Sequence, residues 1–225
     1  MSSILFVFTS ASKTLTGHAA GWYLPEAAHP YYILAPHFDI DFASPAGPNP
    51  PIAEASIKDF ANDEGCVKFL DDETVKDKLA HAKKLVDVDA AKYDAIFYIG
   101  GLGPVIDLAF DETNAKLASE FYQSGKVVSA VCHGPAAIVG AVDASGKSIF
   151  AGKSATSFSN AEEVMLGTVE RIPFSIEDKI TTLGGKFEKA KPWQSHVVVD
   201  GNLITGQNPA SAVGVGEAIL KALQK

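Results

Sequence analysis

The sequence predicts an α/β fold with a central, mostly parallel sheet. Short apolar segments of strand length alternate along the chain with segments of helical periodicity. Several of the apolar segments are continuous, which is typical of parallel strands buried on both faces of a sheet. Because strands alternate with helices, a parallel sheet with helices packed on it is the expected architecture.

Five segments are expected to contribute strands. Residues 4–8, 95–99 and 127–131 are largely apolar, whereas residues 38–42 alternate strictly between apolar and acidic side chains. Strict alternation is typical of a strand with one exposed face. Residues 197–204 contain an Asp-Gly pair and are expected to form a hairpin.

Four segments are expected to be helical: residues 71–86, 114–124, 135–142 and 210–223. The first carries Val75, Leu79, Ala82 and Val86, whose spacing places them on one face of a helix. The third begins with Pro135, and proline is well tolerated in the first turn of a helix because its missing N–H is not needed there.

The length of 225 residues fits one domain that spans the whole chain. Residues 44–64 are expected to form a surface excursion, because four prolines within residues 44–51 prevent regular structure. Residues 150–192 are also less regular. We expect them to form a decorated loop and helix pair over one end of the sheet.

Composition and charge argue against several function classes. Asp and Glu outnumber Lys and Arg by 27 to 19, and no cluster of four basic residues occurs, so nucleic-acid binding has little support. No stretch approaches the ~20 apolar residues that span a bilayer, and the N-terminus lacks the charged start of a secretory signal. Two cysteines make no disulfide framework. We expect the protein to be located in the cytoplasm, with the nucleus as a second expected location. We expect it to bind neither nucleic acid nor membranes.

The most informative segment is the junction around Cys132. A largely apolar strand runs into Cys132, His133 and Gly134, and Pro135 then begins the next predicted helix. This order is that of a nucleophile elbow with cysteine in place of serine, and Gly134 would allow the sharp turn. The helix N-terminus would favour a thiolate, and the backbone N–H of His133 could stabilise an oxyanion. We therefore predict that Cys132 is a nucleophile.

A second turn, at residues 99–104, is the other expected part of the site. Its glycines let the backbone approach a ligand closely, and the N–H of Gly101 or Leu102 could complete an oxyanion hole. The turn matches neither a P-loop nor a dinucleotide fingerprint, and no cofactor is expected. No histidine pair has the spacing of a zinc motif, so no metal is expected. Cys66 has acidic neighbours that disfavour a thiolate.

Together these segments resemble the DJ-1/PfpI superfamily. Residues 130–135, with the glycine turn upstream, match its nucleophile motif. Residues 21–30 are similar to the N-terminal glutamate motif of its fungal heat-shock-protein-31 branch. Segments 152–156, 163–167, 192–193 and 205–212 resemble further motifs of that branch. The resemblance covers nearly the whole chain. It implies a flavodoxin-like, class I glutamine-amidotransferase-like three-layer sandwich, and a homodimer.

The resemblance also implies which residues act in catalysis. The family's nucleophile falls on Cys132, its neighbouring histidine on His133, its helix-borne glutamate on Glu26 and its triad acid on Glu163. Glu162 is adjacent to Glu163 and stays open as an alternative. The family often has histidine in the glycine turn where this chain has Leu102, which leaves the substrate preference open.

That branch includes glyoxalase III enzymes, so the resemblance implies conversion of methylglyoxal, a small 2-oxoaldehyde, to D-lactate without glutathione. The chemistry suits the residues, because a thiolate can add to the aldehyde as a hemithioacetal. His133 is then the best candidate to move a proton through an enediol. Two alternatives remain open. One is a cysteine hydrolase of the same superfamily, a peptidase or protein deglycase, and the other is a non-catalytic stress chaperone or redox sensor.

Overall fold

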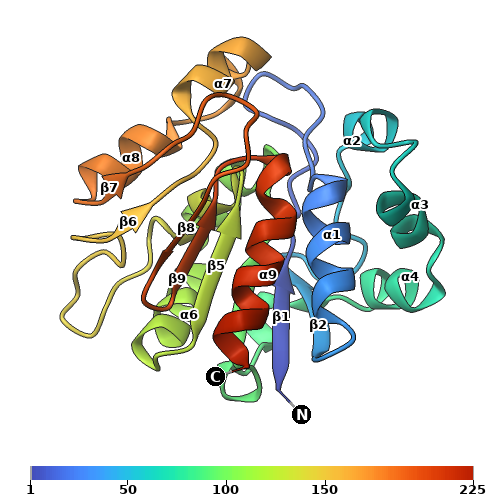
Figure 1. The fold of residues 1–225 in the computed structure, drawn as a ribbon, viewed down its shortest axis with the longest axis horizontal. Coiled ribbons are helices and arrows are strands. Elements are labelled where there is room, and N and C mark those ends of the chain that lie inside the picture. Colours follow the sequence, from blue (N-terminus) through green and yellow to red (C-terminus); the bar gives the residue numbers. More distant parts are fainter. Residues whose placement is uncertain (1, 225) are drawn as a thin grey trace.

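A seven-stranded sheet forms the centre of the molecule (Figure 1). The computed structural model describes residues 2–224. The strand order is β3-β2-β1-β4-β5-β9-β8, and every neighbouring pair is parallel except β8 and β9. The strands are β1 (Ser3–Val7), β2 (Asp39–Ser44), β3 (Lys83–Lys84), β4 (Ala95–Tyr98), β5 (Val127–Val131), β8 (Val197–Asp200) and β9 (Leu203–Gly206). The predicted mostly parallel sheet is confirmed.

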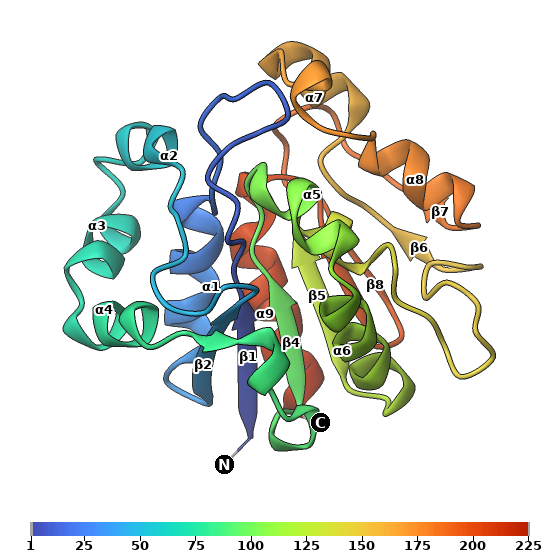
Figure 2. The ribbon, with the colours of Figure 1, turned by 180° about the vertical axis from the view of Figure 1, so that it is seen from behind.

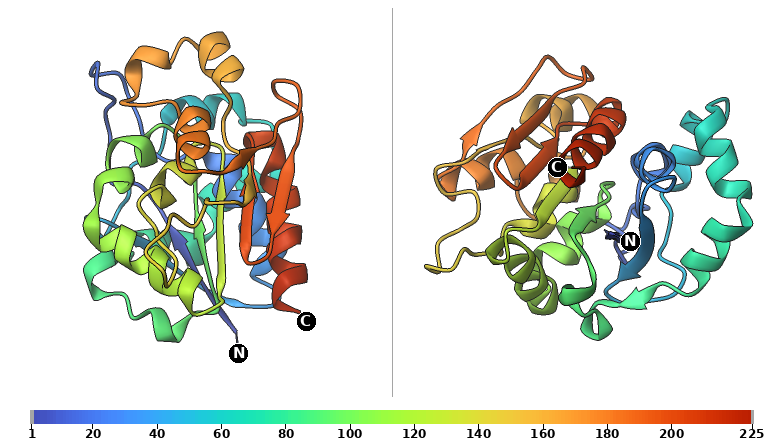
Figure 3. Two further views of the ribbon diagram at one scale, coloured as in Figure 1. Left: turned by 90° about the vertical axis from the view of Figure 1, so that its left-hand side faces the viewer. Right: turned by 60° about the horizontal axis from the view of Figure 1, so that its bottom comes forward.

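Helices cover both faces of the sheet, which is therefore the middle layer of three. α1 (Leu24–Leu34) and α9 (Ala212–Leu223) lie on one face, and α5 (Gly103–Ile106) and α6 (Glu112–Gln123) lie on the other (Figure 1, Figure 2). Seen edge-on, the sheet separates α9 from α6 (Figure 3). The remaining helices are α2 (Glu54–Asp59), α3 (Glu64–Asp71), α4 (Glu73–Ala80), α7 (Asn160–Leu166) and α8 (Ile176–Thr182). Within the described part of the chain, none of the helices is long and apolar enough to cross a lipid bilayer.

Strand β1 shows why the central strands are apolar at every position. Ile4 and Phe6 belong to the core beneath α1 and α9, whereas Leu5 and Val7 belong to the core beneath α6. Successive side chains of a strand point to opposite faces. A strand between two helical layers therefore buries all of its side chains, which explains the continuous apolar segments of the sequence.

The helix predicted over residues 71–86 is wrong beyond Ala80. Asp72 caps the start of α4 and the helix ends at Ala80, after which Lys83–Lys84 form β3 and pair in parallel with the end of β2. Val86, which was expected on the apolar helix face, is exposed. The edge of a sheet offers free backbone partners, and the spacing of apolar residues along the chain cannot reveal them.

The helix predicted over residues 135–142 is wrong in type and length. The segment forms a short 3-10 helix, Gly134–Ile138, in which every residue is buried. It lies against α5 and α6, and short connectors of this kind commonly adopt the tighter 3-10 geometry.

Two regions that the sequence marked as irregular contain regular elements. Residues 44–64 include α2. Residues 150–192 contain α7 and α8 together with a second, two-stranded parallel sheet formed by β6 (Ser154–Ala155) and β7 (Lys186–Phe187). The sequence did not predict this small sheet. α7 lies near the carboxyl ends of the central strands (Figure 1).

A buried asparagine connects α6 to the segment that follows β5. Asn114 accepts a hydrogen bond from the Tyr98 hydroxyl at 2.8 Å. Its amide donates to the carbonyl oxygens of Leu108 at 3.1 Å and Ala137 at 2.6 Å. Ala137 belongs to the 3-10 helix just after Cys132. The network therefore holds β4, α6 and the segment after Cys132 in fixed relative positions.

We expect Asn114→Ala to lower the free energy of unfolding by about 2–4 kcal/mol, because it leaves the Tyr98 hydroxyl and the buried Ala137 carbonyl without partners and removes one of the two donors to the Leu108 carbonyl. Tyr98→Phe removes a single donor and should cost about 1 kcal/mol. Urea denaturation of both variants measures the difference. Equal losses in the two variants would contradict the assigned role of Asn114.

Candidate active site

Cys132 lies at the carboxyl end of β5, in the left-handed region of backbone conformation. Its φ is +60° and its side chain is buried. A residue other than glycine is strained in this region, as the nucleophile of an elbow is. Gly134 was expected to provide the turn, but its φ is not positive. Gly134 is instead required by space, because a Cβ there would lie 2.5 Å from the Tyr98 carbonyl oxygen.

His133 connects the thiol to a buried carboxylate. His133 Nδ1 lies 3.3 Å from Cys132 Sγ, and His133 Nε2 lies 2.6 Å from Glu163 Oε1. Thr168 Oγ1 donates a hydrogen bond to Glu163 Oε2. An ionised carboxylate can only accept hydrogen bonds, so we assign the proton of neutral His133 to Nε2. Nδ1 then presents its lone pair to the sulfur.

The pKa of Glu163 is lowered from its usual value. Burial alone would raise this pKa, but the hydrogen bonds from His133 and Thr168, and the positive charge that His133 carries when it is protonated, outweigh the effect of burial. Glu163 is therefore ionised at neutral pH and can orient the imidazole.

The neighbouring Glu162 contacts a different part of the chain. It accepts hydrogen bonds from Ser159 in a capping box at the start of α7. It also accepts hydrogen bonds from the Trp193 backbone N–H at 2.9 Å and from the Asn208 amide at 2.9 Å. Of the two adjacent carboxylates, Glu163 is the one that contacts His133.

Glu26 approaches Cys132 from the first turn of α1. It is fully buried, and neither carboxyl oxygen makes a hydrogen bond of standard geometry with another described residue. A Cβ on Gly100 would overlap Glu26 Oε2 and would lie 2.9 Å from Cys132 Cβ. The missing side chain of Gly100 is therefore what allows the acid and the thiol to come together.

Burial raises the pKa of Glu26 to about 8, against weaker opposing effects of the Cys132 side chain and the Gly100 backbone. Burial also raises the pKa of the Cys132 thiol, and the charge of Glu26 raises it further, whereas the Gly101 backbone lowers it. Two negative charges repel each other strongly in a buried site of low dielectric constant. Glu26 and Cys132 therefore retain at least one proton between them at neutral pH. The low pKa expected for Cys132 from a helix N-terminus is wrong, because a five-residue 3-10 helix does not offset complete burial.

A pocket of about 220 Å³ gives access to Cys132 and His133. Phe158 stacks on the His133 ring with the ring centroids 4.4 Å apart, and Trp193 meets Phe158 edge-on. Glu26 and Glu163 do not line this pocket. A bound molecule would therefore meet the thiol and the imidazole, while the two carboxyl groups act from behind them.

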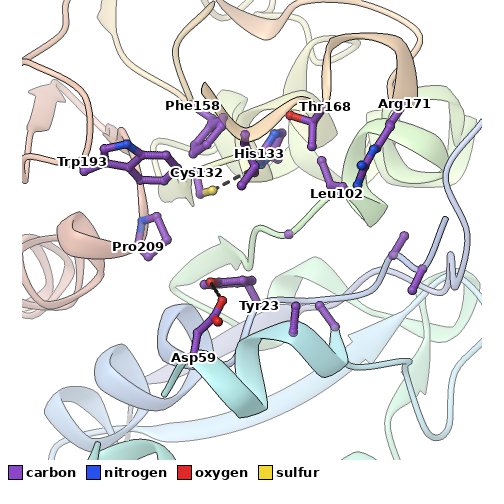
Figure 4. Close-up of a pocket in the computed structure, with 16 residues that line it drawn as sticks. Tyr23, Asp59, Leu102, Cys132, His133, Phe158, Thr168, Arg171, Trp193 and Pro209 are labelled. Carbon is purple, nitrogen blue, oxygen red and sulfur yellow. Dashed lines mark hydrogen bonds between the residues drawn. The ribbon is translucent and has the colours of Figure 1, made fainter. Parts of the chain in front are cut away.

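The opposite wall of the pocket carries polar groups. Figure 4 shows Tyr23 and Asp59 across the cavity from Cys132, and the Tyr23 hydroxyl donates a hydrogen bond to Asp59 at 3.0 Å. Gly101 and Leu102, from the turn after β4, also line the pocket. Both turns that the sequence singled out therefore reach the same cavity.

Phe158, Thr168 and Arg171 are among the lining residues that were not predicted from the sequence. Thr168 directly follows the segment 163–167 that the sequence did single out. Arg171 is the only arginine in the chain, a signal that was present in the composition. Phe158 gave no signal, because a single aromatic residue predicts only core packing.

The second cysteine lies outside this pocket. Cys66 belongs to α3 and is fully buried. Burial, together with the smaller effect of Asp63, raises the pKa of its thiol to about 12. The predicted low reactivity of Cys66 therefore agrees with its surroundings, although burial has a larger effect than the acidic neighbours.

Comparisons with known proteins find relatives over the full length. The glutathione-independent glyoxalase HSP31 of Saccharomyces cerevisiae is 32% identical over 231 residues, covering 98% of this chain and 98% of the relative. The Rapid Encystment Protein 24 KDa of Francisella tularensis has 35% identity and a TM-score of 0.94, with 99% of each chain covered. Glyoxalase III of Candida albicans has 29% identity and a TM-score of 0.89, with 98% of this chain and 97% of that chain covered.

The model of the DJ-1/PfpI family matches residues 26–222, from the buried glutamate of α1 almost to the end of α9. Because this match extends over most of the sequence, the chain belongs to the DJ-1/PfpI family.

Proposed function

We propose that the protein is a glutathione-independent glyoxalase that converts methylglyoxal to D-lactate. The observation that carries this proposal is the line of contacts from Cys132 through His133 to Glu163 at the base of a small pocket. The yeast relative, which is named a glutathione-independent glyoxalase and matches at full length, supports it.

In the first step, Cys132 Sγ adds to the aldehyde carbon of methylglyoxal. The thiol proton passes to His133 Nδ1 as the carbon–sulfur bond forms, and the aldehyde oxygen gains a negative charge. We assign the backbone N–H groups of Gly101, Leu102 and His133 to this oxyanion. Protonation of the oxyanion gives a hemithioacetal. Glu163 stabilises the positive charge that His133 carries meanwhile.

In the second step, a proton moves from the former aldehyde carbon to the neighbouring carbon. His133 removes the proton to give an enediol, and its return to the adjacent carbon gives a lactate thioester on Cys132. Water then attacks the thioester, releases D-lactate and restores the thiol. The sum is the addition of one water molecule to methylglyoxal, without an oxidant or a reductant.

Glu26 is assigned as a neutral acid beside the sulfur. Its raised pKa keeps it protonated at pH 7, so it can donate a hydrogen bond to the Cys132 thiolate without adding a second negative charge. In this role it compensates for part of the effect of burial on Cys132.

The size of the pocket favours a small substrate. A cavity of about 220 Å³ accommodates a three-carbon oxoaldehyde, whereas a peptidase or a deglycase must admit part of a polypeptide chain. Assembly as a homodimer is a further part of the proposal and rests on the family resemblance. A single domain, a cytoplasmic or nuclear location and activity without a cofactor are also parts of the proposal.

The proposed activity is tested with purified protein and methylglyoxal in a buffer without small thiols, followed by chiral analysis of the lactate. We expect one D-lactate for each methylglyoxal consumed, at a rate that added glutathione leaves unchanged. Activity that appears only with glutathione would contradict the mechanism in which Cys132 supplies the thiol. Release of amines from glycated peptides without lactate would favour the hydrolase instead.

We expect Cys132→Ser and Cys132→Ala to lose turnover in the same assay, because both remove the sulfur that forms the thioester. Both should keep the unfolding midpoint close to that of the wild type. Normal turnover in either variant would exclude a covalent intermediate on Cys132. Suppression of aggregation of a client protein that survives in both variants would indicate a separate chaperone function.

Loss of a positioned general base typically lowers the rate by about 10²–10⁴-fold, and we expect His133→Ala to lower kcat by that amount in the same assay.

The adjacent pair Glu163 and Glu162 offers a matched comparison. Glu163→Gln should lower kcat at least about tenfold, because the neutral amide no longer stabilises the imidazolium. Glu162→Gln should reduce stability with little effect on kcat. The reverse order of the two glutamate variants would exchange their assigned roles.

The raised pKa of Glu26 makes stability depend on pH. Between the usual glutamate pKa of 4.5 and the raised pKa of about 8, Glu26 keeps its proton in the folded protein and loses it in the unfolded chain. Stability therefore falls as pH rises through this window, by up to about 1.4 kcal/mol per pH unit. Glu26→Gln has no proton to lose, so its stability should fall less steeply. Urea denaturation at several pH values measures both slopes, and parallel curves would show that Glu26 is ionised throughout.

A further inference from the structure

Three side chains of metal-ligand type meet between α1 and α3. His29 Nε2 lies 3.0 Å from Asp63 Oδ1 and 3.9 Å from Cys66 Sγ, and all three potential ligand atoms lie within 4.8 Å of one another. None of the three residues lines the pocket that contains Cys132. The cluster is therefore separate from the candidate active site.

The combination of donor atoms in this cluster favours some metal ions over others. A thiolate, an imidazole and a carboxylate together suit Zn²⁺ and Co²⁺, whereas Mg²⁺ and Ca²⁺ prefer oxygen ligands alone. Bonds of about 2.0–2.3 Å in a tetrahedral zinc site place the ligand atoms roughly 3.3–3.8 Å apart. The observed separations of 3.0 and 3.9 Å lie close to that range, so small side-chain movements would complete three positions and leave the fourth for water.

The backbone already holds two of the ligands in place. Asp63 is the N-cap of α3, and its Oδ1 accepts a hydrogen bond from the Cys66 backbone N–H at 2.8 Å. The third ligand, His29, comes from α1, where Tyr31 packs edge-on against Phe69 of α3 with ring centroids 5.5 Å apart. This packing fixes the relative position of the two helices without any metal.

A cation can reach the cluster from solvent. Cys66 is fully buried, but the His29 and Asp63 side chains keep 21% and 32% of their exposure. An entering ion would therefore meet the imidazole and the carboxylate first and the sulfur last. Binding would release the Cys66 proton to solvent, since the thiolate is the ligand.

We propose that His29, Asp63 and Cys66 bind a single Zn²⁺ or chemically similar cation, which connects α1 to α3. This revises the expectation of no metal, which rested on sequence spacing alone. His29 is 34 residues before Asp63, and only the packing of α1 on α3 brings them together. A bound ion would hold in place the helix that also carries Glu26.

The test uses Co²⁺ as a spectroscopic substitute for Zn²⁺, with reduced, chelator-treated full-length protein. We expect one Co²⁺ per chain and a near-ultraviolet absorption band from thiolate-to-cobalt charge transfer. The two cysteines give a matched control: Cys132→Ser should keep the band, and Cys66→Ala should lose it. A band that disappears in Cys132→Ser and persists in Cys66→Ala would move the metal to the active site and overturn the proposal.

Affinity and stability give a second readout. Competition with a chromophoric chelator should show Zn²⁺ affinity at least about tenfold lower in His29→Gln and Asp63→Asn, and Asn at position 63 can still cap α3. Saturating Zn²⁺ should raise the Tm of the wild type and not that of His29→Gln, a partly exposed position that tolerates substitution. Failure of the wild type to bind any Zn²⁺ in this competition, or equal affinity in all variants, would show that the cluster only packs α1 against α3.

Discussion

The candidate active site depends on how closely two turns and the start of α1 can approach at the carboxyl edge of the sheet. β4 and β5 are parallel neighbours with Tyr98 opposite Ala130, so the turns that follow them meet. A side chain at position 100 would separate Glu26 from Cys132, and a side chain at position 134 would collide with the Tyr98 carbonyl oxygen. Both positions are glycine, so the segments can pack closely. This packing excludes water, and the exclusion of water is what raises the pKa of both Glu26 and Cys132.

Residues of one type take different roles because their surroundings differ. Glu162 and Glu163 are adjacent, yet one caps α7 and accepts bonds from the C-terminal segment while the other contacts His133. Glu26 is a third buried carboxyl group, and its pKa shifts upward while the pKa values of the other two shift downward. The difference follows from partners, since Glu162 and Glu163 have hydrogen-bond donors and Glu26 has little to offset its burial.

Helix α1 joins the two sites that the structure assembles. Its first turn places Glu26 behind Cys132, and one turn later His29 faces Asp63 at the start of α3. Tyr32 of the same helix donates a hydrogen bond to Asp72 at the start of α4. The position of Glu26 is therefore coupled through a rigid helix to the outer helices, and the proposed cation would strengthen that coupling.

Much of the fold and part of the site could be predicted from the sequence. Continuous apolar segments identified the central strands, because a strand covered on both faces has no side that tolerates polar residues. The order of strand, cysteine, histidine and glycine identified Cys132 and His133, because these residues are adjacent in the chain. Glu26 and Glu163 came only from the family resemblance, since no local pattern distinguishes a buried carboxyl group from an exposed one.

Other features depended on contacts between distant segments and could not be predicted. β3 forms because the edge of β2 offers it a partner, and Phe158 reaches His133 only through the folding of residues 150–192 over the sheet. The raised pKa of Cys132 depends on burial and on Glu26, which the first turn of α1 contributes. The sequence by itself determined the layers of the fold and the turn at Cys132 and His133, because periodicity and adjacent residues are local properties. Only the tertiary structure decided the protonation of the site, the choice between Glu162 and Glu163, and the cluster at His29, because burial and distance between remote residues exist only in the folded chain.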